Sequence, residues 1–175
     1  MKYKLTKWIS IVVTLGMLTV TIHASESTKP LTFDFKSTQG QSITIEESAS
    51  GFKFPTLKGK NVLVMFYIHR QPCKDAIRVL SDAQKRHSNL EIIGFDLVDS
   101  DDSVLNKFAA EQKAENIIYI NKKQSSQFAD YMAPRARWPG TVPFIIIVND
   151  KGEVKHMQLG GIPAEKFDEL YKKVM

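Results

Sequence analysis

The segment that most constrains the fold of this chain is an apolar stretch followed by a short loop and the only cysteine. The apolar stretch, Val62–Ile68, is rich in β-branched and aromatic residues and predicts a buried strand. Cys73 then stands at the start of a helical pattern, whose apolar face would contain Ala76, Ile77, Leu80 and Ala83. A helix N-terminus carries partial positive charge, which favours a thiolate over a thiol. The sequence therefore places any chemistry at Cys73.

Alternating and apolar stretches predict the remaining strands. Residues 31–35 and 42–46 alternate and would form a β-hairpin with Gly40 in its turn. Residues 48–57 are expected to form an irregular connection. Further along the chain, short apolar stretches predict strands at residues 90–98, 116–120 and 144–148, with a returning strand at 153–159.

An acidic run follows the second of the buried strands. Asp99–Asp102 offers an N-cap and acidic side chains for the start of a helix, whose apolar face would contain Val104, Leu105 and Phe108. Three aspartates supply too few oxygen ligands for a hard cation. We therefore interpret this run as a helix start in preference to a metal site.

Two further helices are expected in the second half of the chain. Residues 125–132 have a helical pattern, and Pro134 is expected to break the chain after them. Pro163 suits the first position of a final helix. Strands that alternate with helices and end in a hairpin and a helix indicate an α/β sandwich with a mixed central sheet.

The first residues have the pattern of a secretory signal peptide. Lys2, Lys4 and Lys7 precede the apolar stretch Trp8–Val20, and a small residue, Ala24, follows. We expect cleavage after Ala24, a flexible lead over residues 25–30, one domain over 31–175, and export to the periplasm. An uncleaved N-terminal anchor is the alternative, and only then would the protein contact a membrane. Without the three lysines the formal charge falls from +5 to +2, which gives no reason to expect a nucleic-acid partner.

A single cysteine limits the chemistry of an exported protein. No intramolecular disulfide can form, so Cys73 is expected to be buried, paired with another molecule or reactive. His69 is close to it along the chain, but no other cysteine or histidine lies nearby in the sequence. A zinc site is therefore not expected, and we predict neither a metal nor a cofactor.

The residues around Cys73 resemble the active-site segment of the thioredoxin superfamily, and most closely that of the periplasmic TlpA/ResA-like thiol–disulfide proteins. Those proteins carry a strand, Trp-Cys-x-x-Cys and a helix, often with a proline before the second cysteine. Pro72-Cys73 matches that pair, while Arg70 stands near the first cysteine and His69 near the tryptophan. The resemblance implies a thioredoxin-like three-layer sandwich over residues 31–175. It also implies a degenerate active-site loop of His69, Arg70, Gln71 and Pro72 before Cys73.

The resemblance also implies a second part of the site. Thr141-Val142-Pro143-Phe144 stands where a thioredoxin-like protein keeps a cis-proline that faces its active-site cysteines. Pro143 would then face Cys73, and the backbone of Val142 could pair with an extended peptide. An ordinary trans proline at the start of a strand is the alternative that base rates favour without the resemblance.

Two functions remain open. Cys73 could act as a single thiol that exchanges with protein or small-molecule thiols and disulfides, helped by the charge of Arg70 or by His69 as a base. Alternatively, the protein is a redox-inactive module that binds extended or thiol-bearing peptides, with Cys73 as a core residue. Peroxide reduction of the peroxiredoxin type is disfavoured, because the threonine that those proteins place three residues before the cysteine is Arg70 here.

Overall fold

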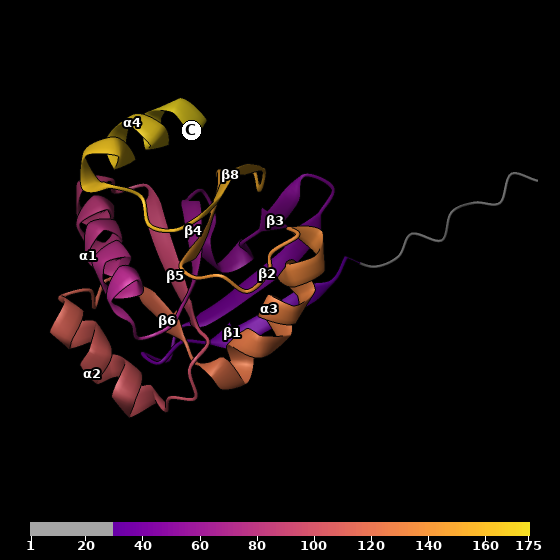
Figure 1. The fold of residues 1–175 in the computed structure, drawn as a ribbon. Helices are drawn as coiled ribbons and strands as arrows, with labels where there is room; N and C mark the ends of the chain where they lie inside the picture. Colours follow the sequence, from indigo (N-terminus) through magenta and orange to yellow (C-terminus); the bar gives the residue numbers. More distant parts are fainter. Residues whose placement is uncertain (1–29) are drawn as a thin grey trace, which may run out of the picture.

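The computed structural model describes residues 30–175, and the predicted signal peptide lies outside the described residues. These residues form a central five-stranded sheet and a smaller three-stranded sheet, with helices packed around them (Figure 1). None of the described helices is long and apolar enough to cross a membrane.

The central sheet is mixed, as the sequence predicted. Its strand order is β6-β5-β4-β7-β8; the first three strands run parallel, and the last two are antiparallel to their neighbours. Every residue of β4 and of β7 is buried, because both strands lie inside the sheet and both of its faces are covered. The bounds of the five strands are β4 Asn61–Tyr67, β5 Leu90–Asp96, β6 Ile118–Ile120, β7 Phe144–Val148 and β8 Val154–Leu159.

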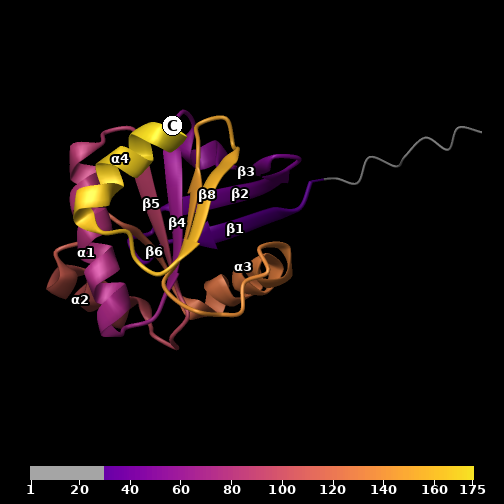
Figure 2. The same ribbon diagram turned by 45° about the horizontal axis from the view of Figure 1, so that its top comes forward.

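Two apolar clusters cover the two faces of this sheet. One contains side chains from α1 (Gln71–Arg86), α2 (Asp102–Gln112) and α4 (Ala164–Val174). The other contains side chains from α3 (Lys122–Arg135) and from the small sheet. Figures 1 and 2 show α1 and α4 on one side of the sheet and α3 on the other. The result is the predicted three-layer sandwich.

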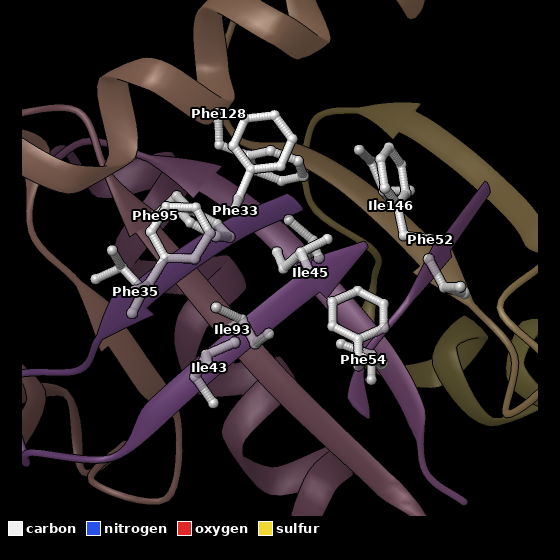
Figure 3. Close-up of a cluster of buried hydrophobic side chains, with 14 of the residues drawn as sticks. Phe33, Phe35, Ile43, Ile45, Phe52, Phe54, Ile93, Phe95, Phe128 and Ile146 are labelled. Carbon is white, nitrogen blue, oxygen red and sulfur yellow. The ribbon is translucent and has the colours of Figure 1, made fainter. Parts of the chain in front are cut away.

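The small sheet carries the predicted hairpin and one additional strand. Its strands β1 (Thr32–Lys36) and β2 (Ser42–Ser48) pair antiparallel, and Gly40 in their turn has a φ of 84°. Their inward-facing aromatic and aliphatic residues pack on the central sheet and on Phe128 of α3 (Figure 3). Residues 48–57 were expected to be irregular, but β3 (Gly51–Lys53) pairs with β2, and Pro55–Leu57 form a 3₁₀ turn. A strand of three residues is too short to show an alternating pattern.

Two expectations about helices were wrong in detail. Val104 is 46% exposed, so the buried face of α2 contains Leu105 and Phe108 without it. Pro134 does not end its helix, because α3 runs one residue further to Arg135; the missing N–H of Pro134 removes one hydrogen bond from the last turn. The predicted start of α2 is confirmed: Asp101 is its N-cap and accepts a hydrogen bond from the Val104 N–H at 2.8 Å.

Candidate active site at the start of α1

The cysteine lies in the first turn of α1, directly after the central strand of the sheet. β4 ends at Tyr67, and the loop that follows leads to Arg70, which is the N-cap of α1. The Arg70 carbonyl accepts hydrogen bonds from the N–H groups of Cys73 and Lys74, both at 3.0 Å. Pro72 lies in the first turn, where a missing N–H costs nothing. The predicted order of strand, loop, cysteine and helix is confirmed, although the helix begins two residues before Cys73.

Cys73 is buried, with 1% of its surface exposed. Its side chain belongs to the apolar cluster beneath α1, against which Ile68 and Val142 also pack. Burial raises the pKa of the Cys73 thiol, and a hydrogen bond with the Ile68 backbone opposes that shift only in part. The expected stabilisation of a thiolate by the helix N-terminus is therefore outweighed by the loss of solvent.

The polar residues at the end of the loop are exposed, whereas Cys73 is buried. Arg70 and Gln71 are exposed, and the Gln71 amide donates to Asp75 Oδ1 at 2.8 Å. Desolvation and the Ile68 backbone account for the pKa shift of Cys73, so Arg70 does not lower that pKa as its charge alone suggested. Arg70 is exposed to solvent at the N-cap of α1.

His69 is directed toward α2. Its ring stacks on Phe108 with centroids 4.3 Å apart, and its Nε2 lies 3.2 Å from Asp96 Oδ1. The two atoms are close but are not aligned for a hydrogen bond, because His69 Nε2 has no hydrogen-bond partner among the described residues. This placement gives His69 no contact through which it could act as the base for Cys73.

Two residues of this region were not singled out from the sequence. Tyr67 and Asp96 are neighbours across β4 and β5, and both are fully buried. Within residues 30–175, Tyr67 Oη and Asp96 Oδ2 have no hydrogen-bond partner. Burial, then the charges of Asp96, Tyr119 and Cys73, raise the pKa of Tyr67 well above its usual value. The available signal was Asp96 at the end of a mostly apolar strand, because a buried position is unusual for a charged residue.

The second part of the predicted site, the Val142–Pro143 segment, borders the apolar cluster that contains Cys73. The Val142–Pro143 peptide bond is cis. Val142 is half-buried and packs against the cluster that contains Cys73, and Pro143 is buried. The Pro143 carbonyl accepts from the Gly160 N–H at 2.8 Å, and the Trp138 indole donates to the Thr141 carbonyl at 2.7 Å. These contacts fix the segment before β7 against the end of β8 and the end of α3.

Comparison with known proteins identifies the family. Residues 31–157 match the AhpC/TSA family over most of the chain. The chain belongs to the AhpC/TSA family. No curated protein sequence matches it. This AhpC/TSA chain thus combines a thioredoxin-like fold with a single buried cysteine, and the residue three positions before Cys73 is an arginine.

Several solved structures share the fold of this AhpC/TSA chain. StoA from Bacillus subtilis is 20% identical, with a TM-score of 0.59, over 81% of this chain and 97% of its own. A thiol:disulfide interchange protein of the thioredoxin family from Chlorobium tepidum is 19% identical, with a TM-score of 0.60, over 83% and 95%. A secreted disulfide oxidoreductase from Mycobacterium tuberculosis is 13% identical, with a TM-score of 0.58, over 81% and 95%. At these identities the likeness shows the thioredoxin-like fold.

Proposed function

We propose that this protein is a single-cysteine member of the thiol–disulfide class that binds extended or thiol-bearing peptides and does not turn over disulfides by itself. The observation that carries this proposal is the burial of its only cysteine, which is 1% exposed. Exchange begins with attack by an accessible thiolate, and it ends when a second thiol releases the mixed disulfide. Cys73 lacks the access that the first step needs, and the chain lacks a thiol for the second.

The surface beside Pro143 supports the binding role. Leu159 of β8 is paired with Phe144, and both Leu159 and Met157 are about half exposed. With Trp138 they line a hollow of about 280 Å³ next to the Val142–Pro143 segment. Exposed apolar side chains along an edge strand suit an extended peptide, whose side chains alternate between the two faces. We propose that the peptide also pairs with the backbone of Val142 before Pro143, the two residues that precede Phe144 in the lining of this hollow.

Single-thiol exchange is the second candidate function, because Cys73 lies in the first turn of a helix in a fold shared with disulfide oxidoreductases. In that function, Cys73 would attack a partner disulfide and form a mixed disulfide, while one partner sulfur leaves as a thiolate. The side chains that cover Cys73 would have to move before its sulfur could attack. Thiol titration distinguishes the two candidates.

We expect Cys73 of the folded protein to react with an aromatic disulfide reagent at neutral pH more than about tenfold more slowly than in the unfolded chain. Because the pKa of Cys73 is raised, its thiolate forms only at higher pH. The reaction rate should therefore rise only at pH values above those at which an ordinary thiol ionises. The measurement is thiolate release followed by absorbance, across a pH series, with and without denaturant; Cys73→Ser gives the blank. Rapid stoichiometric reaction of the folded protein at neutral pH would instead support single-thiol exchange.

We also propose that the protein is exported and that residues 31–175 are its functional domain. Support comes from the basic residues and apolar stretch before Ala24 and from the fold shared with a secreted protein. Expression of the full chain in a bacterium with a periplasm is expected to yield protein that begins at Ser25. N-terminal sequencing of each cell fraction tests this, and full-length chain found only in the cytoplasm would contradict it.

A further inference from the structure

A second pocket lies at the opposite end of β4 from Cys73. It is formed by β3, by the segment that leads into β4 and by the turn between β7 and β8, and its volume is about 390 Å³. β4 has seven residues, which separates the pocket from the cysteine loop by about 20 Å. The volume is within the range of small-molecule sites. Nothing in the proposed function uses this pocket.

Lysine side chains from three separate segments line the pocket. They are Lys53 of β3, Lys58 and Lys60 before β4, and Lys151 in the β7–β8 turn, and Asp150 is the one acidic residue among the lining residues. Lys60 is engaged by Glu91 at 3.6 Å and by the Ser88 carbonyl at 2.8 Å. Within residues 30–175 the other three lysines have no carboxylate within 4.0 Å. Their convergence produces a positive potential that favours an anion.

The floor of the pocket is apolar. Phe52, Phe54 and Leu57 line it, and each is 6–8% exposed. The three side chains belong to the cluster that fills the space between the two sheets, part of which Figure 3 shows with Phe52 and Phe54 labelled. Because the rest of each side chain is packed in this cluster, the floor cannot rearrange freely. The pocket thus combines a fixed apolar floor with a cationic rim.

The turn that carries Lys151 is held in one conformation. Asn149 Oδ1 accepts from the N–H groups of Lys151 and Glu153 at 3.1 and 2.9 Å, and Asn149 Nδ2 donates to the Glu153 carboxylate. The buried Asn61 accepts from the Asp150 N–H at 2.9 Å. Gly152 has a φ of 85°, and its carbonyl accepts from the Phe52 N–H at 2.9 Å. A preorganised turn lowers the entropic cost of binding.

We propose that this pocket binds a small organic anion, one whose carboxylate or phosphate meets Lys58 and Lys151 and whose flat apolar part lies on Phe52 and Phe54. The small exposed part of the apolar floor contacts the body of the ligand, and the lysines provide charge for its anionic group. Lys53 extends the positive rim, whereas Asp150 disfavours a second negative charge near the turn. The proposal is independent of Cys73 and of the proposed peptide surface.

The test is an NMR titration of the mature protein with 2-naphthoate. Chemical-shift changes that saturate with ligand concentration are expected for the backbone amides of residues 52–60, other than Pro55, and of residues 149–152. The neutral 2-naphthamide and inorganic phosphate are each expected to bind at least about tenfold more weakly. The amide lacks the negative charge that the lysines would bind, and phosphate lacks the apolar ring that would contact the floor. The double variant Lys58→Gln/Lys151→Gln should raise the Kd about tenfold or more.

A matched control variant distinguishes binding in this pocket from general attraction of anions to a positively charged protein. Lys122→Gln/Lys123→Gln removes the same charge from exposed positions at the start of α3, at the opposite end of the sheet, and should leave the Kd within about twofold of the wild type. Equal weakening by both double variants, naphthamide binding as tight as naphthoate, or shifts scattered over the surface would each overturn the proposal. Shifts confined to residues 138–144 and 157–159 would overturn it as well, by assigning the ligand to the Pro143 side.

Discussion

Replacing Arg70 with cysteine is expected to give this protein a disulfide reductase activity that the wild type lacks. Arg70 is the N-cap of α1, and its carbonyl accepts from the Cys73 N–H at 3.0 Å, so the two residues span one tight turn. Two cysteines at these positions lie within bonding reach. The new thiol, exposed at the N-cap, would attack a substrate disulfide, and the buried Cys73 would release the product by closing the internal disulfide. Dithiothreitol-driven insulin reduction should rise about tenfold or more above the wild-type background.

The control variants show whether the new activity depends on having both cysteines. Arg70→Cys/Cys73→Ser should form a mixed disulfide with substrate but no internal disulfide, and Cys73→Ser alone should be silent. Mass spectrometry of the oxidised Arg70→Cys protein should show the loss of two hydrogens. Wild-type insulin reduction with dithiothreitol that is faster than the uncatalysed reaction would contradict the proposed function. Failure of Arg70→Cys to close a disulfide would show that the start of α1 cannot hold the bonded geometry.

Removing the ring of Phe128 is expected to cause the largest loss of stability among single changes in the core. Phe128 is fully buried, and its ring lies against Phe33 at 5.1 Å, Phe95 at 5.1 Å and Phe52 at 5.6 Å. It therefore joins α3, the small sheet and the central sheet in one contact. Phe128→Ala should lower the free energy of unfolding by about 3–5 kcal/mol, measured by urea unfolding.

Val104→Ala provides the comparison for that measurement. Val104 is 46% exposed on α2, and its truncation should change the free energy of unfolding by less than about 0.5 kcal/mol. A loss below about 1 kcal/mol for Phe128→Ala would mean that the cluster collapses around the missing ring. In that case Phe128 is not the residue on which the packing of α3 depends.

Strands with long apolar patterns could be predicted from the sequence, whereas short ones could not. Phe144–Val148 is a run of apolar residues between a proline and a tight turn, and the strand has those bounds in the structure. β3 has three residues, and its pairing depends on the bends allowed by Gly51, which has a φ of 149°. The exposure of Val104 depends on which turn of α2 meets α1, which the spacing of apolar residues does not specify.

The position of Cys73 in the fold could be predicted from the sequence, but its pKa could not. The strand–loop–helix pattern located Cys73, because that pattern is local. Its pKa depends on solvent access, which is removed by a cluster of side chains that includes residues distant in sequence. The nearby sequence indicated only the helix N-terminus and the charge of Arg70, and both would lower the pKa of Cys73. Burial raised it instead. The contact of His69 with Asp96 likewise depends on the pairing of β4 with β5, which the loop sequence does not encode.

The position of the small sheet has a consequence for the order in which the protein is assembled during synthesis. β1 and β2 are the first described strands to be made, and they can pair at once because their turn is short. The apolar side of that hairpin, however, packs against Phe128 and against β7, which are made late. Until α3 is complete, Phe33, Phe35 and Ile45 can be covered only by β4 and β5 and lack the cover that Phe128 provides. A ribosome that stalls before α3 therefore presents a paired aromatic ribbon, which is the kind of surface that chaperones bind and that aggregates form from.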